Sequence, residues 1–322
     1  MVQDLRGGKA ALICGSVAYD TILVFPDRFK AHILPDKLHI LNVAFLVPEM
    51  RREFGGCAAN IAYSLHLLGD LGLPMATAGH DFGPYRERLT SQGINIEHVK
   101  MVDGTFTAQA FITTDLDDNQ ITAFHPGAMQ YAHLNKVSDA AAGITLGIVA
   151  PDGRQAMIEH AEQFAKAKIP FIFDPGQGLP MFGGEELGRF IEQASWVAVN
   201  DYEWGLLQQK TGLTALDIAA RVDALIVTKG AEGSVIYAEG RTLDIPCVKP
   251  KAVVDPTGCG DAYRAGLIHG LLRGLDWETT GRLASLMGSI KIESRGPQNH
   301  EFTRAEFKRR YQQSFDQVPE GI

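Results

Sequence analysis

The sequence lacks several motifs that would assign its chemistry at once. It contains no G-x-G-x-x-G fingerprint after its first apolar segment, no G-x-S-x-G elbow and no H-E-x-x-H pair. These absences argue against a nicotinamide-dependent dehydrogenase, an α/β-hydrolase and a zinc protease. The Gly-Gly-Lys sequence at residues 7–9 lacks the spacing of a P-loop and the Ser or Thr that follows its lysine.

Cysteine is scarce and scattered. The four cysteines (Cys14, Cys57, Cys247 and Cys259) form no C-x-x-C pair, so neither a zinc site nor a disulfide framework is favoured. The N-terminal apolar run is closed by Asp20 and lacks a cleavage region, and no run has the length of a transmembrane helix. We therefore expect reduced thiols and a cytoplasmic location.

Basic residues are outnumbered, with 30 Lys and Arg against 38 Asp and Glu and a net charge of −8. This balance argues against nucleic acid as a partner, because a phosphate backbone requires a basic surface. The 322 residues, 45% of them hydrophobic, suffice for one large domain that carries a smaller insertion. We expect a small-molecule partner and no membrane partner, for a monomer or a homodimer.

From about residue 144, short apolar strands alternate with helical stretches such as residues 153–168. This alternation predicts an α/β fold with a doubly wound, mostly parallel sheet flanked by helices. The predicted strands are TLGIVAP, PFIFDPG, SWVAVN and ALIVTKG, followed by a hairpin in GSVIYAEGRTLDIP and by helices that begin at Gly260, Trp277 and Thr303.

Several early strands do not fit this alternation. TILVF begins at Thr21, HILNVAFLV begins at His39, and residues 108–125 contain two strand-like runs around the turn sequence LDDN. We predict a small β-sheet lid from residues 20–52 and 103–125. The α/β body then comprises residues 1–19, 53–102 and 126–322. The pattern equally permits an extension of the main sheet at its edge.

The stretch DPTGCGDAYRAG places Gly258, Cys259 and Gly260 directly before Asp261 and a helical segment. Small residues expose backbone N–H groups, and the first turn of a helix leaves more of them unpaired, which attracts anions such as phosphate. A carboxylate at such a site suits proton transfer, while the amides hold the charge that develops. The alternative is a purely structural turn.

Polar residues follow other predicted strands. Asp20 follows the first strand, Asn200 and Glu203 lie in NDYE after another, and residues 228–230 (TKG) follow a third. The carboxyl ends of the strands are where open α/β sheets bind ligands.

A glycine pair, Gly55 and Gly56, precedes a predicted helix that contains Asn60. The pair either lets backbone approach a ligand closely or makes a tight turn.

These motifs together resemble the ribokinase or PfkB family of carbohydrate and nucleoside kinases. DPTGCGDAYRAG resembles the family's second signature, D-T-x-G-A-G-D, and GGCAANIAYSLHLLG its first; NDYE and TKG are similar to its N-x-x-E motif and its nucleotide-binding turn. The likeness covers almost the whole chain in the same order. The chain departs from the pattern at Pro256, and at Cys259 where alanine is common.

Within the family, the chain is most similar to bacterial nucleoside kinases of the adenosine kinase type. ICGSVAYDTILVF, LNVAFLVPEMRREFGGCAANIAY, ITTDLDDNQITAFHPGAM and FIFDPGQGLP carry this likeness. The resemblance implies ATP-dependent phosphorylation of the 5′-hydroxyl of a ribonucleoside, adenosine or another purine nucleoside, as in purine salvage. Asp261 is the implied general base, and the amides of Gly258, Cys259 and Gly260 would stabilise the transferring phosphoryl group.

The resemblance also implies a set of binding residues. Acceptor-binding residues are Ser16, Asp20, Gly55, Gly56, Asn60, Gln109, Phe111 and Asp261. ATP-binding residues are Asn200, Glu203, Thr228, Lys229, Gly230, Gly233, Gly258 and Gly260. Asn200 and Glu203 would hold Mg²⁺ through water, and Asp255 marks a candidate site for a monovalent cation such as K⁺.

The lid would close over the substrates and exclude water. Phe45, Phe111 and Phe124 are candidates for stacking on a base, or are core residues of the lid. A sugar kinase of the ribokinase or fructokinase type would keep every catalytic feature and differ only in lid and pocket. A non-catalytic nucleotide-binding regulator could dispense with Asp261, which is present.

Overall fold

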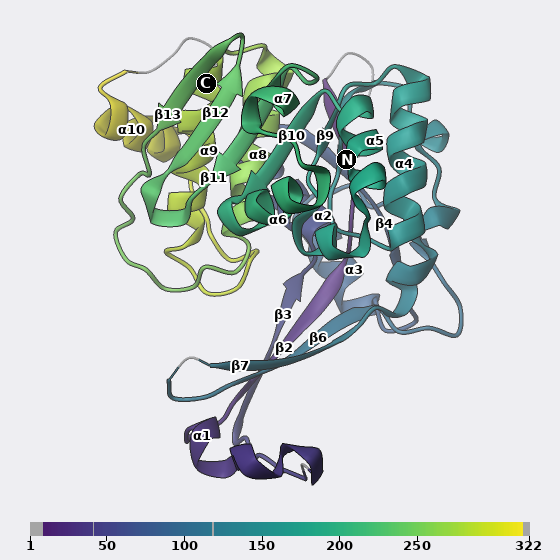
Figure 1. The fold of residues 1–322 in the computed structure, drawn as a ribbon, viewed down its shortest axis with the longest axis vertical. Coiled ribbons are helices and arrows are strands. Elements are labelled where there is room, and N and C mark those ends of the chain that lie inside the picture. Colours follow the sequence, from purple (N-terminus) through teal and green to yellow (C-terminus); the bar gives the residue numbers. More distant parts are fainter. Residues whose placement is uncertain (1–8, 41, 118, 318–322) are drawn as a thin grey trace.

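A large sheet of nine strands forms the centre of the protein, in the order β13-β12-β11-β10-β9-β8-β1-β4-β5 (Figure 1). The computed structural model describes residues 9–40, 42–117 and 119–317. Neighbouring strands run parallel, except that β12 is antiparallel to both of its neighbours, β11 and β13. The predicted doubly wound, mostly parallel sheet is therefore confirmed. Its strands are β1 (Ala10–Cys14), β4 (Leu71–Ala78), β5 (Val99–Met101), β8 (Ile144–Val149), β9 (Phe171–Phe173), β10 (Trp196–Asn200), β11 (Ala224–Thr228), β12 (Ser234–Ala238) and β13 (Arg241–Ile245).

Helices cover both faces of this sheet, because its central strands are apolar on both sides. In β1, Ala11 and Ile13 pack in one hydrophobic cluster, while Leu12 and Cys14 pack in another on the opposite face. Four helices contribute residues to the first cluster: α2 (Cys57–Leu68), α3 (Gly83–Ser91), α8 (Cys259–Arg273) and α9 (Trp277–Lys291). Four others contribute residues to the second cluster: α4 (Arg154–Ala167), α5 (Gly184–Gln193), α6 (Asp201–Thr211) and α7 (Ala215–Ala219). The last helix, α10 (Arg304–Phe315), packs on α9.

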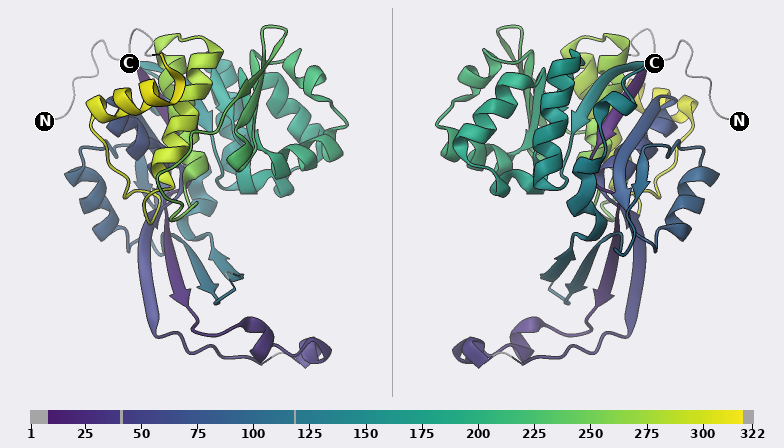
Figure 2. Two further views of the ribbon diagram at one scale, coloured as in Figure 1. Left: turned by 90° about the vertical axis from the view of Figure 1, so that its left-hand side faces the viewer. Right: turned by 90° about the vertical axis from the view of Figure 1, so that its right-hand side faces the viewer.

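The early strands form a second sheet that projects from the body (Figure 2). Its order is β3-β2-β6-β7, so these strands are not an extension of the main sheet. The predicted hairpin over residues 108–125 is confirmed by the antiparallel pair β6–β7. The other antiparallel pair, β2–β3, joins this hairpin because β2 pairs parallel to β6. The strands are β2 (Ala18–Val24), β3 (Glu49–Gly55), β6 (Ala108–Thr114) and β7 (Gln120–His125).

The strand predicted over HILNVAFLV is wrong. His39 and Ile40 end a 3-10 helix, and residues 42–48 have no regular structure before β3 begins. The apolar side chains have no sheet to cover: Ile40 and Leu46 are 64% and 83% exposed. Residue 41 of this run lies outside the described residues. Phe45 packs into an aromatic cluster with Phe25 and Phe29, at ring-centroid distances of 4.8 and 5.0 Å.

The remaining elements are short. None of the helices in the described ranges is long and apolar enough to span a membrane. The short elements are α1 (Phe29–His32), η1 (Pro35–Ile40), η2 (Gly127–Leu134), η3 (Val137–Asp139), η4 (Gly176–Met181) and η5 (Gly230–Glu232).

Candidate active site

The glycine-rich turn leads directly into α8. Gly258 is the N-cap and has φ 81°, a left-handed conformation that favours glycine, and a Cβ at this position would lie 2.6 Å from Cβ of Pro297. The amide of Cys259 donates to the carbonyl of Pro256 at 3.1 Å, so it closes the turn. Among the described residues, no backbone oxygen or side chain accepts from the amides of Gly260 or Asp261. The amide of Gly258 likewise has no acceptor among the described residues, so the open donors of the turn are at Gly258, Gly260 and Asp261, whereas the predicted donor at Cys259 is already bonded.

Asp261 lies in the first turn of α8 and is fixed by one hydrogen bond. Nδ2 of Asn60, in α2, donates to its Oδ2 at 2.8 Å. Burial raises the pKa of Asp261 to about 7, with the Asn60 bond opposing the rise and the negative charge of Asp174 adding to it. A carboxyl with a pKa near neutrality can accept a proton from a substrate and release it again.

Gln298, which belongs to none of the motifs and follows no predicted strand, orients Asn60. Its Nε2 donates to Oδ1 of Asn60 at 2.8 Å and to the hydroxyl oxygen of Tyr85 at 2.5 Å. Tyr85 in turn donates to the carbonyl of Gly55 at 2.7 Å. Since the amide oxygen of Asn60 is occupied by a donor, its nitrogen must face Asp261. This network connects the end of β3 to the candidate base.

Asp20 lies within β2 of the small sheet and not at the end of the first strand, β1, as the sequence predicts. Its register partner on β3 is Glu53, on the same face as Arg51, which lies 3.9 Å from the Asp255 carboxylate. Burial raises the pKa of Asp20 to about 6, and the neighbouring charges of Glu53 and Asp255 raise it further. No described residue donates a hydrogen bond to its carboxylate. A Cβ on Gly55 would collide with Oδ2 of Asp20, which explains a glycine at this position. The Asp20 carboxylate is free to accept hydroxyl groups.

Gly56 and Ser16 shape the start of α2 beside Asp20. Gly56 has φ 91°, and a Cβ there would lie 2.6 Å from both the nitrogen of Ala18 and the carbonyl oxygen of Ser16. The hydroxyl oxygen of Ser16 accepts from the amide of Cys57 at 3.3 Å. The structure therefore brings together Ser16, Asp20, Gly55, Gly56, Asn60 and Asp261.

Two predicted acceptor residues lie elsewhere. In the strand register, Asp20 pairs with Ala110, whereas Gln109 pairs with Tyr19 and Phe111 with Thr21. Directly paired residues share a face, so Gln109 and Phe111 project from the face opposite to Asp20. Nε2 of Gln109 donates to the hydroxyl of Thr21 at 2.6 Å on that face.

Of the three candidate stacking residues, one remains on the Asp20 face. Phe124 pairs with Ala110, which pairs with Asp20, and its side chain is 50% exposed. Phe45 is packed against Phe25 and Phe29 at the tip of the small sheet and serves the core of that tip.

The predicted nucleotide residues meet at the carboxyl end of β10 and β11. Asn200 and Thr228 are register neighbours there, and the amide of Lys229 donates to the carbonyl of Gly233 at 2.8 Å. Gly230 and Gly233 have φ 55° and 89° in the loop that follows. Ser234, next to this loop, shares a 2.6 Å hydrogen bond with Tyr263 of α8. The loop therefore lies beside the helix that carries Asp261.

Asn200 and Glu203 form a reciprocal cap on α6. The side chain of Asn200 accepts from the amide of Glu203 at 2.8 Å, and the Glu203 carboxylate accepts from the amide and the Nδ2 of Asn200 at 2.9 and 2.8 Å. A carboxylate has about four acceptor positions, so two remain for water. The described residues contain no cluster of three or more His, Cys, Asp or Glu that could hold a metal. These oxygen donors fit Mg²⁺ that arrives with ATP and keeps its waters.

A buried ion pair connects α8 with the segment that follows β9. Nη2 of Arg264, one turn after Asp261, donates to Oδ1 of Asp174 at 2.9 Å, and both side chains are buried. Burial raises the pKa of Glu203, and the charge of Asp174 raises it further. Asp174 follows β9, so the strand-end rule that selected Asn200 would also have selected Asp174.

The candidate monovalent-cation position at Asp255 already contains a charged group. Nζ of Lys291, the last residue of α9, donates to the backbone carbonyl of Asp255 at 2.8 Å and to that of Ser294 at 3.1 Å. The Asp255 carboxylate accepts from the amides of Thr257 and Gly296, both at 2.9 Å. The residues present therefore do not fit a K⁺ ion at these carbonyls.

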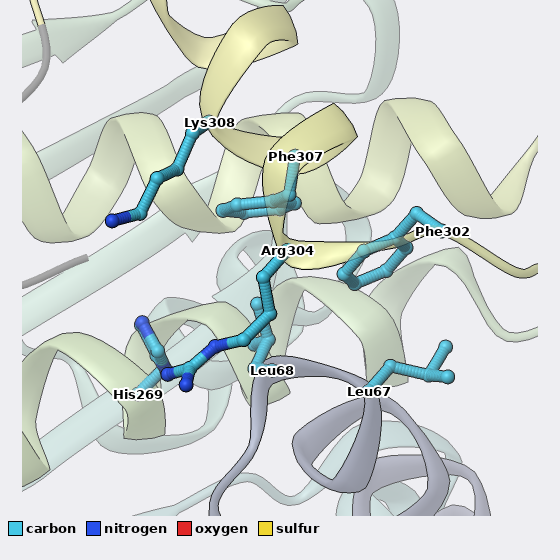
Figure 3. A pocket seen from close by; sticks show the side chains of 7 residues that line it. All are labelled: Leu67, Leu68, His269, Phe302, Arg304, Phe307 and Lys308. Carbon is cyan, nitrogen blue, oxygen red and sulfur yellow. The ribbon is translucent and has the colours of Figure 1, made fainter.

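A small surface pocket is lined by none of these residues (Figure 3). It is lined by Leu67 and Leu68 at the end of α2 and by His269 near the end of α8, with α10 beside them. Asn60 and Asp261 lie near the beginnings of the same two helices. The pocket is therefore a packing seam at the opposite end of α2 and α8, and not part of the candidate active site.

The Cys259 side chain provides a test of the turn. Cys259→Ala is expected to retain most activity, because the thiol, whose pKa burial raises to about 11, is neutral and makes one long hydrogen bond, 4.0 Å to the Asp255 carbonyl, among the described residues. Cys259→Val should lower kcat more, since a branched Cβ is stiff and crowds the turn. Steady-state kinetics of both variants, with thermal melts to verify folding, check this. A folded but inactive alanine variant would give the thiol a role.

Comparison with known proteins agrees with this geometry. The profile of the pfkB family of carbohydrate kinases matches residues 20–304. The structure of a nucleoside kinase from Burkholderia thailandensis in complex with inosine is 52% identical, has a TM-score of 0.88, and covers 97% of this chain and 100% of that one. The structure of that kinase in complex with ADP-inosine is 54% identical, with a TM-score of 0.86 and coverage of 97% and 98%.

A more distant relative gives the same result. The nucleoside kinase of Methanocaldococcus jannaschii is 34% identical over 261 residues, which are 80% of this chain and 85% of that protein. The ribokinase-like fold, the two signatures at α2 and α8, and the carboxylate at the start of α8 are thus explained together. The chain belongs to the pfkB family of carbohydrate kinases and is a phosphotransferase with an alcohol group as acceptor.

Proposed function

We propose that this protein uses ATP to phosphorylate the 5′-hydroxyl of a ribonucleoside, with adenosine or another purine nucleoside as the preferred acceptor. The observation that carries the proposal is the position of Asp261: its carboxyl is fixed by Asn60 beside the open amides at the start of α8. The Burkholderia thailandensis kinase, similar over nearly the whole chain, is described in complex with inosine and with ADP-inosine, which supports a purine nucleoside as acceptor.

Asp261 acts as the general base in this proposal. It accepts the proton of the 5′-hydroxyl while the hydroxyl oxygen bonds to the γ-phosphorus and ADP leaves with the bridging oxygen. The amides of Gly258, Gly260 and Asp261, at the positive end of the α8 dipole, stabilise the charge on the transferring phosphoryl group. The turn thus supplies positioning and electrostatics, the two main contributions to phosphoryl transfer.

Mg²⁺ completes the nucleotide site in the proposal. When bound with ATP, it neutralises charge on the phosphates. Glu203 and Asn200 would hold it through water, and the loop of Lys229, Gly230 and Gly233 would receive the nucleotide. Burial of Glu203 keeps its carboxylate oriented by the Asn200 cap.

The small sheet supplies the acceptor side. Asp20 accepts the two ribose hydroxyls, and Phe124, on the same face and half-exposed, stacks on the base. We propose that residues 20–52 and 103–125 act as a lid that covers the bound nucleoside and excludes water.

A competition assay tests the acceptor class. Adenosine, inosine, deoxyadenosine, ribose and fructose are supplied at equal concentration with ATP and Mg²⁺, and kcat/KM is measured for each. We expect the highest value for a ribonucleoside. A higher value for ribose or fructose than for every nucleoside would replace the nucleoside proposal with a sugar kinase of the ribokinase or fructokinase type.

The raised pKa of Asp261 predicts the pH profile of the reaction. Only the carboxylate can accept a proton, so kcat/KM should rise with pH, level off above about 7, and fall about tenfold per unit below it. Asp20, with its pKa raised to about 6, adds a second loss at lower pH. The measurement is kcat/KM for the acceptor at saturating ATP and excess Mg²⁺. A profile that is flat between about pH 5 and 7 would exclude Asp261 as the base.

The proposal includes a role in purine salvage in the cytoplasm, where ATP is available and thiols stay reduced. The free state of all four cysteines is consistent with that compartment.

A further inference from the structure

Lys291 is a buried lysine for which the reaction described so far has no use. Its side chain is 0% exposed, although lysine is almost never fully buried unless it is paired. Among the described residues no carboxylate lies within ion-pair distance of its Nζ, and its hydrogen-bond partners are two backbone carbonyls. Carbonyl oxygens that converge on one positive charge are the donor set of a monovalent-cation site.

The two carbonyls belong to the segments that build the anion-binding turn. Asp255 begins the turn, and its carboxylate accepts from the amide of Thr257 within the turn and from that of Gly296 in the second segment. The second segment runs from Ser294 to Pro297, against which Gly258 packs. Burial by itself would raise the pKa of Asp255, but the two amides and Lys291 hold it below its ordinary value, so the carboxylate is charged.

Removal of the ammonium would leave the carbonyls of Asp255 and Ser294 without their shared donor, so the two segments would keep only the bond from the Gly296 amide to the Asp255 carboxylate among those described above. The main-chain amides of Val254 and Asp255 also bond to the carbonyl of Ile292, at 2.9 and 3.1 Å, but these bonds do not reach the segment from Ser294 to Pro297. The single Nζ atom of Lys291 bonds to both segments, through the carbonyl of Asp255 in one and that of Ser294 in the other. Burial lowers the pKa of Lys291 below its ordinary value, and the negative charges of Asp255, Glu53 and Asp261 oppose this fall.

We infer that the Lys291 ammonium is a built-in cation that holds the turn in its anion-binding form, so that this kinase needs no monovalent metal ion. Lys291 is a positioning residue: it acts through Asp255 and the turn and does not touch the substrates. The inference rests on the proposed role of the turn. It replaces the expectation of a K⁺ site near Asp255.

The first arm of the test uses the unmodified protein. Activity is measured at one ionic strength in choline chloride, NaCl or KCl, always with Mg²⁺ and ATP. We expect the same kcat and KM in all three salts. Stimulation by KCl relative to choline chloride would overturn the inference without any mutation.

The second arm removes the ammonium. Lys291→Ala leaves a space lined by the carbonyls of Asp255 and Ser294, and should lose about 10²-fold in kcat in choline chloride, the scale of a small misplacement of catalytic groups. KCl or NH₄Cl should restore much of this loss and should also raise the Tm of the variant, because an ion that binds only the folded state stabilises it. Neither salt should raise the Tm of the parent beyond the effect of choline chloride.

The control is Lys210→Ala. Lys210 likewise donates to two backbone carbonyls, those of Pro180 and Phe182, but at the far end of α6 from Glu203. This variant should show neither loss nor salt rescue.

Two results for a folded Lys291→Ala protein overturn the inference: full kcat in choline chloride, or a loss that K⁺ and NH₄⁺ restore in neither kcat nor Tm. If alanine does not fold, Lys291→Met is used with the same criteria. The Tm readout needs no turnover, so it distinguishes failure of this inference from failure of the proposed function.

Discussion

Replacement of Asp261 by asparagine is expected to lower kcat by about 10²–10⁴, the usual contribution of a general base. The KM for ATP and for the acceptor should stay within a few-fold. The isosteric amide keeps the shape of the site and removes only the group that accepts the proton. Steady-state kinetics with adenosine or inosine measure this, and the residual activity should lose its dependence on pH near 7.

A stability measurement tests the same residue by another route. The pKa of Asp261 is raised in the folded protein, so its neutral form is preferred there, and folding loses stability as pH rises from the unfolded value toward 7. Asp261→Asn carries no charge and should therefore melt at higher temperature than the parent above about pH 7. The difference should shrink toward about pH 4.

The matched control is Asp276→Asn, which changes the carboxylate that caps the neighbouring helix α9. Asparagine is an equally good N-cap, so this variant should keep the activity and melting behaviour of the parent. Near-normal turnover in folded Asp261→Asn would remove Asp261 from the mechanism.

The sequence predicted those features that depend on local pattern. Apolar strands alternate with helices from β8 to β11, and the hairpins β6–β7 and β12–β13 surround turn residues, so both sheets could be anticipated. Asp261 was found because its glycine turn and helix start are contiguous in sequence. Asn200 and Thr228 were found because each ends a strand at the ligand-binding edge. Asp20 was selected by the same rule, although it lies within β2 of the small sheet and not at the end of β1.

The parts that failed depend on which segments meet in space. The predicted strand from His39 has the right composition but no partner strand, and Pro48 cannot donate to a ladder. Gln109 and Phe111 lie on β6 as expected. Their face, however, is set by the register with β2, where a shift of one residue exchanges the two sides.

The missed residues are partners of the predicted ones across long separations. Gln298 orients Asn60, and Lys291 holds the carbonyl of Asp255, but neither belongs to a motif or follows a strand. The role of the Cys259 amide was also hidden, because its bond to the carbonyl of Pro256 depends on the exact turn conformation. Such contacts arise only when the chain is folded.

Asp20→Ala is expected to lower kcat/KM for the nucleoside by about 10²-fold while leaving the KM for ATP nearly unchanged. A carboxylate that accepts two ribose hydroxyls contributes about 1.5–3 kcal/mol per bond, and no other described residue competes for the Asp20 oxygens. The parent should discriminate against 2′- and 3′-deoxyadenosine, because each leaves the carboxylate underpaired.

The sharpest form of this test is a cycle between the variant and these analogues. In Asp20→Ala, removal of a ribose hydroxyl should cost little more, since its partner is already absent. Asp36→Ala, an exposed acidic residue of the same projecting segment, is the control and should behave as the parent. Two results would argue that Asp20 is structural: equal weakening of ATP and nucleoside, or unchanged discrimination against both deoxynucleosides in the variant. Selective loss of the hydroxyl preference would instead place the ribose at the Asp20 carboxylate, on the face of the small sheet that also presents Phe124.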